Sequence, residues 1–262
     1  MNLFTYAGLL CLLSPLIHCQ AVADDLPLTT LLAKRGKLIV DDDGAKTRGG
    51  KTVFELQDSV GVKAALGTWV RAEPESNIWR STWKEGMGHP PVVSYPGMDA
   101  KNLIVEVTFR FGEVTEPWHS QFLRIAADQR PQIKGHIVSA WANPNGHYTK
   151  QGFVLEHLAP KSEAKKSRLL LMDHQPITTQ PNTWYTAVLE IVDDEALYRM
   201  GDHLAYAKAE QFLTHKNLIS LTLGTTWHEI KRVRVWHAEA HPEWKTKKDT
   251  TLKSRNPFTP NW

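Results

Sequence analysis

The chain has 262 residues, of which 42% are hydrophobic and 23% charged, and its formal net charge is +3. Residues 242–262 hold five Lys and Arg residues against two acidic ones, so they account for the whole excess and the rest of the chain is close to neutral. A nucleic-acid-binding protein would spread a basic patch over its folded surface, and the sequence therefore predicts no nucleic-acid partner. The length is sufficient for one large domain with its own hydrophobic core.

The N-terminus has the pattern of a secretory signal peptide. Residues 7–17 (AGLLCLLSPLI) form an apolar run too short to span a bilayer, and residues 21–23 (AVA) form a small-x-small cleavage site. We expect cleavage near Ala23 and a secreted or periplasmic protein. Both cysteines, Cys11 and Cys19, lie in the predicted signal, so the mature chain would contain no disulfide. No later apolar stretch is long enough for a transmembrane segment.

After the signal, the chain is typical of β-strands separated by turns. The clearest strand is 103–111 (LIVEVTFRF), whose odd-numbered residues are apolar while Glu106, Thr108 and Arg110 lie on the other face. Similar runs occur at 37–41, 52–57, 68–72, 120–126, 136–142, 153–157, 168–172, 184–192, 196–200, 204–207, 218–223 and 231–237.

Turns and helices complete this pattern. Turn-forming residues occur at 95–97, 143–146 and 180–182, a short helical turn is expected at 28–35, and 159–166 is a charged loop or brief helix. About a dozen strands with no helical partners predict an all-β sandwich or barrel. We expect one domain over residues 24–241, followed by a basic, flexible tail over residues 242–262.

Several motifs in the chain resemble a known group of domains. They are 67–73 (GTWVRAE), 109–111 (FRF), 184–192 (WYTAVLEIV), 201–206 (GDHLAY), 216–224 (KNLISLTLG) and 232–236 (RVRVW). Together they resemble secreted bacterial concanavalin A-like lectin/glucanase-fold domains of the 3-keto-disaccharide hydrolase-like family. They are more distantly similar to laminin-G and glycoside hydrolase family 16 folds. The resemblance implies a concanavalin A-like jelly-roll β-sandwich and a carbohydrate context, but a fold of this kind hosts many functions.

Two departures separate the chain from the enzymes of these families. The 3-keto-disaccharide hydrolase-like domains have an N-S-G-[IV]-x-x-R strand, whereas residues 119–124 read HSQFLR and keep only the Ser and the Arg. A retaining glycosidase needs two carboxyl groups about 5–5.5 Å apart. In 190–195 (EIVDDE), period-two geometry turns Asp193 and Glu195 away from Glu190, and Asp193-Asp194 is typical of a hairpin turn.

A candidate glycan site is predicted on one sheet face. Glu106, Arg124 and His136 are the candidate catalytic residues, with His136 or Glu106 as base and Arg124 stabilising developing negative charge, for hydrolytic or lytic cleavage. The candidate substrate-binding residues are Trp79, His89, Arg110 and Trp141. The alternative is that these polar residues pair across strands and only cover an outer face.

The ten tryptophans divide by position. Trp69, Trp184 and Trp236 lie in strand patterns and are predicted to be core residues. Those that flank turns suit ligand contact at a rim, namely Trp79, Trp83, Trp118 and Trp141.

Motifs for cofactors are lacking. The sequence has no H-E-x-x-H pattern, G-x-S-x-G elbow, P-loop or dinucleotide fingerprint, so we predict no metal and no cofactor. The resulting hypothesis is a secreted sandwich that binds or processes glycan, with catalysis left open. The alternatives are a non-catalytic envelope or adhesion module, whose basic tail touches acidic polysaccharide or a partner protein, and a purely structural sandwich. The sequence assigns neither a sugar nor an oligomeric state.

Overall fold

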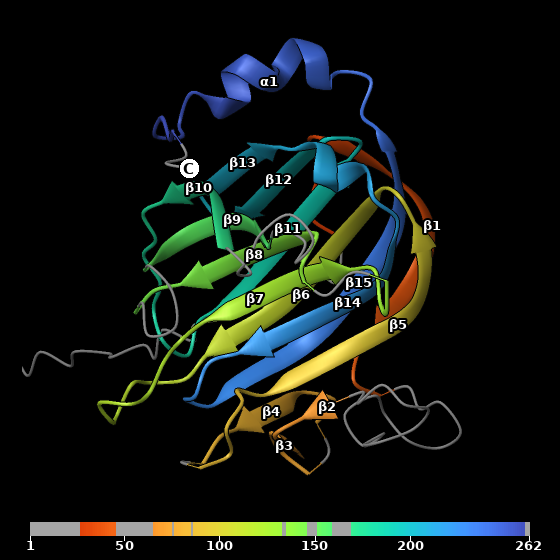
Figure 1. Ribbon diagram of the computed structural model, residues 1–262. Helices are drawn as coiled ribbons and strands as arrows, with labels where there is room; N and C mark the ends of the chain where they lie inside the picture. Colours follow the sequence, from red (N-terminus) through yellow and green to blue (C-terminus); the bar gives the residue numbers. More distant parts are fainter. Residues whose placement is uncertain are drawn as a thin grey trace, which may run out of the picture.

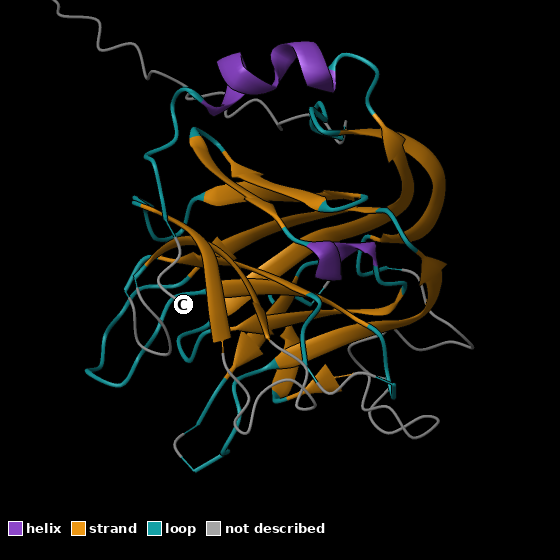
Figure 2. Cartoon of the chain, turned by 45° about the horizontal axis from the view of Figure 1, so that its top comes forward, coloured by secondary structure: helices purple, strands orange, loops and turns teal. Residues whose placement is uncertain are grey.

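The structure is a computed structural model that describes residues 27–45, 65–74, 76–84, 86–132, 135–145, 151–158 and 169–259. The predicted signal peptide, the predicted strand 52–57 and the charged segment 159–166 lie outside these residues. The described residues form two β-sheets that face each other, with one α-helix beside them (Figures 1 and 2).

The first sheet has eight strands. In spatial order they are β13 (His203–Lys208), β12 (Glu195–Met200), β11 (Trp184–Val192), β6 (Leu103–Phe111), β15 (His228–Ala240), β4 (Trp79–Thr82) and β3 (Thr68–Arg71), with β1 (Ala33–Asp42) also paired to β15. Strand β15 pairs with β4 through residues 228–230 and with β1 through residues 233–240, so β4 and β1 follow one another along β15.

The second sheet has seven strands. In spatial order they are β10 (Leu169–Gln175), β9 (Gly152–Leu158), β8 (Val138–Asn143), β7 (Leu123–Asp128), β14 (Lys216–Leu223), β5 (Val92–Ala100) and β2 (Ala65–Leu66). A 3₁₀ turn, η1 (Glu210–Leu213), precedes β14, and the helix α1 (Trp244–Leu252) follows β15. All strand pairs of the described residues are antiparallel, which confirms the predicted all-β jelly-roll sandwich.

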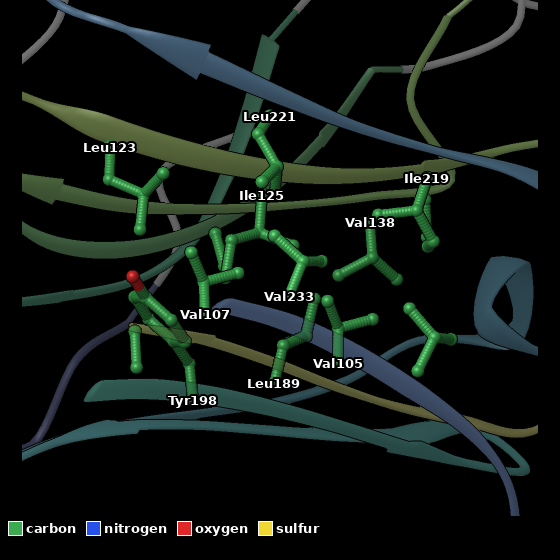
Figure 3. Packing of buried hydrophobic residues seen from close by; sticks show 14 of the residues in the cluster. Val105, Val107, Leu123, Ile125, Val138, Leu189, Tyr198, Ile219, Leu221 and Val233 are labelled. Atoms are coloured by element: carbon green, nitrogen blue, oxygen red, sulfur yellow. The ribbon is translucent and has the colours of Figure 1, made fainter. Parts of the chain in front are cut away.

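The main core lies between the sheets, where the alternation of each strand directs its apolar residues inward. Val105 and Val107 of β6 meet Ile125 of β7 and Leu221 of β14, and all four side chains are fully buried (Figure 3). Burying an aliphatic side chain of this size contributes about 1.5–3 kcal/mol. This core holds the two sheets together, and it fixes which side chains point outward.

A second apolar cluster lies on the opposite, outer face of the eight-stranded sheet. It joins residues from the two ends of the chain to outward-facing strand residues, and its buried members are Leu32, Ala33, Ile104, Val188, Val192, Leu197, Trp236 and Trp244. The chain ends therefore cover part of this face.

Two predictions about the chain ends are wrong in the structure. Residues 28–35 do not form a helix, because the backbone N–H groups of Leu31, Leu32 and Ala33 bond to the Glu190 carboxylate and β1 begins at Ala33. The stretch 242–259 is no flexible extension, because it contains α1 and the indole of Trp244 is buried and bonds to Glu195.

Two of the strand predictions are confirmed, and one predicted turn is wrong. Residues 103–111 and 184–192 coincide with β6 and β11, and Asp193, with φ of 52°, lies in the hairpin turn that follows β11. The predicted turn at 95–97 is instead part of β5, where the register with β14 shifts and Gly97 takes a φ of 85°. A bulge of this kind accommodates Pro and Gly within a strand.

Candidate functional site

The predicted site residues are divided between the two sheets. Glu106 and Arg110 belong to β6 of the eight-stranded sheet, whereas Arg124 and Trp141 belong to β7 and β8 of the seven-stranded sheet. His136 lies just before β8. The prediction that these residues share one sheet face is therefore wrong, because the strands that carry them belong to opposite sheets.

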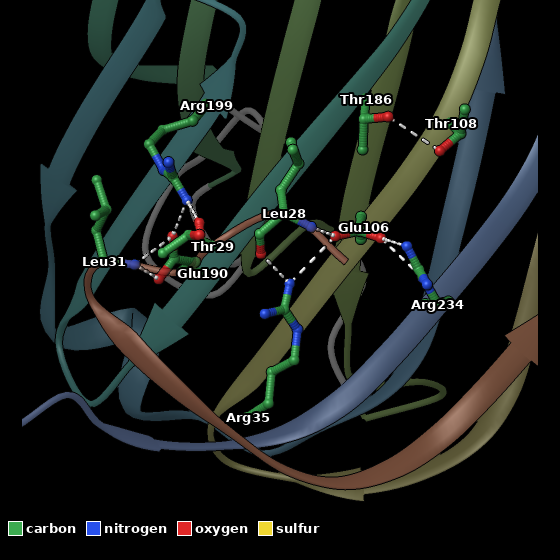
Figure 4. Close-up of polar contacts among 10 residues, drawn as sticks. All are labelled: Leu28, Thr29, Leu31, Arg35, Glu106, Thr108, Thr186, Glu190, Arg199 and Arg234. Atoms are coloured by element: carbon green, nitrogen blue, oxygen red, sulfur yellow. Dashed lines mark hydrogen bonds and ion pairs between the residues drawn. The ribbon is translucent and has the colours of Figure 1, made fainter. Parts of the chain in front are cut away.

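Glu106 is buried beneath the N-terminal segment (Figure 4). Its Oε1 accepts a hydrogen bond of 2.8 Å from Arg234 Nε, and its Oε2 accepts one of 2.8 Å from the Leu28 backbone N–H and one of 3.2 Å from Arg35. Charge-assisted bonds of this kind are among the strong ones in proteins. Both carboxylate oxygens are occupied, so Glu106 fastens the N-terminal segment to the sheet rather than serving as the predicted base.

Glu190 makes a similar anchor on the neighbouring strand (Figure 4). One of its oxygens accepts the N–H groups of Leu32 at 2.8 Å and Ala33 at 2.9 Å, and the other accepts from Arg199 at 3.0 Å. Its side chain is fully buried. Glu106 and Glu190 together hold residues 28–33, which we call the N-terminal strap, across β6 and β11.

Arg110 also has a packing role on the eight-stranded sheet. It bonds to Glu229, a fully buried carboxylate that also accepts a bond of 2.8 Å from Arg80 Nε. The Arg110 guanidinium lies 4.7 Å from the ring centroid of Trp184, and that of Arg80 lies 4.7 Å from the ring centroid of Trp227. The arginines cover the tryptophan faces that a sugar ring would need, so this face is not suited to stacking on sugar.

Two further predicted residues lie away from any common site. Trp79 is buried in the main core, and its Nε1 donates a hydrogen bond of 3.0 Å to the Gly44 carbonyl. His89 is exposed in the loop before β5, where its Nδ1 lies 2.7 Å from the Pro90 carbonyl. The core prediction holds for Trp69, whereas Trp184 and Trp236 lie on the outer side of the eight-stranded sheet.

The outer face of the seven-stranded sheet gathers a different set of groups. Arg124 of β7 is the register partner of Trp141 on β8 and of Thr222 on β14. Its guanidinium donates a hydrogen bond of 2.9 Å to Thr222 Oγ1 and lies 5.1 Å from the Trp141 ring centroid. Ser139 of β8 is opposite Glu156 of β9. Period-two alternation places all of these side chains on the face turned away from the core.

Glu156 is the unusual member of this group. Its Oε1 accepts a bond from Trp141 Nε1, but its buried Oε2 and the buried Ser139 hydroxyl make no hydrogen bond of normal geometry. Burial raises the pKa of Glu156 to about 7, although the Trp141 N–H, the Arg124 charge and the nearby Ser139 hydroxyl act to lower it. A carboxyl group with this pKa exists in both protonation states near neutral pH.

Apolar side chains border the polar ones on the same face. Phe122, just before β7, has its ring centroid 5.1 Å from that of Trp141, and Val154 and Leu171 pack against the same pair. His136 Nδ1 lies 2.8 Å from Asp128 at the other end of β7. Trp141 is itself buried and lies under the Arg124 guanidinium, so this face offers a sugar hydrogen-bonding groups, namely a guanidinium and a carboxyl group with an unpartnered oxygen, rather than an open aromatic surface. We call Arg124, Ser139, Trp141, Glu156 and Thr222 the sheet-face site.

Sequence reasoning found two members of this site and missed three. Arg124 and Trp141 were predicted, whereas Ser139, Glu156 and Thr222 were not. The available signal was Glu156 itself, because it is a lone carboxylate in the strand 153–157 (FVLEH), opposite in parity to the core residues Phe153 and Leu155.

The described residues contain no group of three or more His, Cys, Asp or Glu side chains placed to hold a metal ion. In the same part of the chain, no helix has both the length and the apolar composition needed to cross a membrane.

The chain matches no protein-family profile and no curated protein sequence. Among solved structures, it is similar to the CBM2 module of the evolved Dit protein of Lactobacillus casei BL23 phage J-1. The TM-score is 0.53 at 12% identity, over 79% of this chain and 98% of the module. It also matches the carbohydrate-binding module CBM66 from Bacillus subtilis, with a TM-score of 0.41 at 11% identity over 67% of this chain and 97% of the module.

A third match is the homodimeric agglutinin CG-16 from chicken liver, with a TM-score of 0.42 at 6% identity over 55% of this chain and 98% of the agglutinin. None of the three bears on the 3-keto-disaccharide hydrolase-like family, so that resemblance stays a prediction. The likeness to the phage module shows that this chain has the same lectin-like β-sandwich fold.

Proposed function

We propose that the protein binds glycan through the sheet-face site. The observation that carries this proposal is Glu156, a buried carboxyl group with one unpartnered oxygen, which lies beside Trp141 and Ser139. Sugar hydroxyls both donate and accept hydrogen bonds, so they match a set that contains a carboxyl, a guanidinium and a hydroxyl group. The similar phage domain is named a CBM2 module, which supports carbohydrate as the ligand class.

The carboxylates of the eight-stranded sheet support the choice of face. Both oxygens of Glu106, Glu190 and Glu229 are taken by arginines or by the N-terminal strap. Unpartnered arginine Nε atoms occur on both faces, at Arg35 and Arg199 as well as at Arg124, so they do not distinguish the faces. The unpartnered carboxyl oxygen of Glu156 does distinguish them, because among these carboxylates it occurs on the seven-stranded sheet alone.

We propose binding rather than two-carboxylate hydrolysis. Arg124 is the charged group that affects the pKa of Glu156, and no second carboxylate among the described residues does so. Asp128, another acid on this face, is engaged by His136 at 2.8 Å and by Arg130 at 3.6 Å. Both mechanisms of glycoside hydrolysis need a pair of carboxyl groups flanking the scissile bond. We further propose, on the predicted signal peptide alone, that the protein is exported.

The test compares matched substitutions on the two sheets. Arg124→Lys and Arg110→Lys each keep a positive charge but lose the planar guanidinium. We expect Arg124→Lys to weaken binding of the best array glycan about tenfold, the size of one lost charged hydrogen bond, and Arg110→Lys to leave it unchanged. Glu156→Gln provides a second change in the same site.

Titration calorimetry on the protein without residues 1–23, after a glycan-array screen, measures these effects. Weaker binding in Arg110→Lys alone would show that the ligand binds to the eight-stranded sheet. If the unmodified protein bound no glycan on the array, the proposed function would be wrong.

A further inference from the structure

We infer that Trp83, Trp118 and His119 form a second glycan contact at the end of the sheet-face site, so that the ligand is an oligosaccharide rather than a single sugar. This inference rests on the proposed function. Trp83 follows β4 and Trp118 precedes β7, and their ring centroids are 5.3 Å apart with an interplanar angle of 51°. Both side chains are partly exposed. Because the rings are inclined rather than stacked face to face, each keeps part of its face uncovered.

Arginine contacts distinguish this pair from five of the other tryptophans. A guanidinium lies 4.6 to 5.1 Å from the ring centroid of Trp79, Trp141, Trp184, Trp227 and Trp236. In the described part of the chain, no cation lies over Trp83 or Trp118. A pyranose ring stacks its C–H groups on an aromatic face, so a face without an arginine is the one available to a sugar.

Two hydrogen-bond donors accompany the aromatic pair. Trp83 Nε1 is buried and has no partner. The Nδ1 of His119 is within 3.3 Å of the backbone N–H of Thr115 and 3.2 Å of that of Glu116, so it accepts and the neutral ring carries its proton on Nε2. The His119 ring centroid is 4.2 Å from that of Trp118, in an edge-on arrangement. Aromatic faces beside free N–H donors match the alternating apolar and hydroxyl surfaces of a sugar.

The backbone of this loop is held in place before any ligand arrives. Thr225 Oγ1 donates a bond of 2.9 Å to the Trp118 carbonyl and accepts one of 2.8 Å from the Ser120 N–H. Asn145, which follows β8, donates to the His119 carbonyl at 3.2 Å and accepts from the Gln121 N–H at 3.1 Å. A site that needs little ordering loses little entropy on binding.

Chain connectivity joins the loop to the sheet-face site. Phe122, three residues after His119, packs on Trp141, and Arg124 follows two residues later. Asn145 follows the strand that carries Trp141. The aromatic pair therefore continues the sheet-face site beyond the start of β7, and a ligand that contacts both must contain several sugar units.

The experiment measures affinity against chain length, from one to six sugar units of the glycan selected on the array, for the protein without residues 1–23. We expect affinity to rise with length. Trp118→Ala should remove most of that rise, about tenfold for the longest ligand, and leave the monosaccharide unchanged. Arg124→Lys should weaken the short and the long ligands alike. Trp184→Phe, at an arginine-covered tryptophan, is the matched control and should behave like the unmodified protein.

A second measurement covers the case in which Trp118→Ala fails to fold. The indole N–H resonance of Trp83, assigned through Trp83→Phe, should shift on addition of the hexasaccharide and not of the monosaccharide. An unchanged length dependence in folded Trp118→Ala, or an unmoved Trp83 resonance, overturns the second contact. If Arg124→Lys still weakens binding, the proposed function survives that result. A protein that binds no glycan of any length overturns both proposals.

Discussion

Glu156 differs chemically from the other buried carboxylates because one of its oxygens has no partner. Its pKa of about 7 in the folded protein is above its ordinary value of 4.5, so the folded state holds a proton that the unfolded state has lost. Between those two pH values, the free energy of unfolding must therefore fall as pH rises. The contribution is on the order of 3 kcal/mol, at 1.36 kcal/mol per pKa unit.

We expect Glu156→Gln to remove this part of the pH dependence. The amide has nearly the same shape and cannot ionise, so the variant should be more stable than the unmodified protein at pH 8 and nearly equal to it at pH 4.5. Urea unfolding at the two pH values measures the difference. Equal pH dependence in the two proteins would show that Glu156 ionises normally in the fold.

The free energy of unfolding also depends on pH through Lys216, in the direction opposite to that of Glu156. Its ammonium group is buried and donates to the carbonyls of Lys101 and Phe212. Burial lowers its pKa from 10.5 to about 7, so between these values the unfolded state holds a proton that the folded state has lost. The free energy of unfolding therefore rises with pH over that range. Lys216→Met should abolish the rise, because methionine has no group that titrates; unfolding at pH 7 and pH 10 tests this.

At the scale of one element, the N-terminal strap depends on carboxylates rather than on its own secondary structure. Glu190 accepts the N–H groups of Leu31, Leu32 and Ala33, which neither a helix nor a sheet ladder satisfies. In Glu190→Gln the charge is lost and an N–H₂ group faces these donors. We expect the amide hydrogens of the strap to exchange at least tenfold faster, a difference of about 1.4 kcal/mol.

Hydrogen exchange followed by mass spectrometry or NMR measures the effect on the strap. Glu239→Gln, at an exposed position of β15, is the control and should change nothing. Unchanged protection of the strap in Glu190→Gln would mean that the apolar contacts of Leu32 and Ala33 hold it without the carboxylate.

The strands also show what a sequence can and cannot predict. Alternation placed Glu106 and Arg110 on the outer side of their strand, and Arg124 was predicted to share the same face. Alternation could not show that β6 pairs with β11 and β15 while β7 pairs with β8 and β14, because those pairings join distant segments. The sequence pattern of a polar outer face is the same whether its polar residues pair with arginines or bind a ligand. The strand β5 was missed because Pro96 and Gly97 resemble a turn unless the bulge is known.

At the scale of the whole molecule, α1 and the strap cover the same outer cluster of the eight-stranded sheet. Trp244 is buried there, and Lys248 bonds to Glu195 and Tyr206. Arg255 pairs with Asp173 at 3.1 Å. These contacts engage two of the five basic residues of 242–259 in the fold, Lys248 and Arg255, which weakens the alternative in which the tail is a free adhesive for acidic polysaccharide.

Trp244→Ala tests this arrangement. Loss of a buried Trp should cost about 3–5 kcal/mol of stability and should also raise hydrogen exchange in the strap, because both pack on one cluster. Glycan affinity should stay unchanged, because the sheet-face site belongs to the other sheet. Lys245→Ala, exposed on the same helix, is the control. A loss of glycan binding by folded Trp244→Ala would connect the ligand to the tail instead.

The shared cluster also has a consequence for the order in which the chain folds. Leu32 and Trp244 close the same cluster although they are about two hundred positions apart in the chain, and contacts of such separation form slowly. A polypeptide synthesised from its N-terminus has the strap long before it has α1. The outer cluster therefore stays open until α1 has been synthesised, so it closes later than contacts among the strands that precede α1 can form.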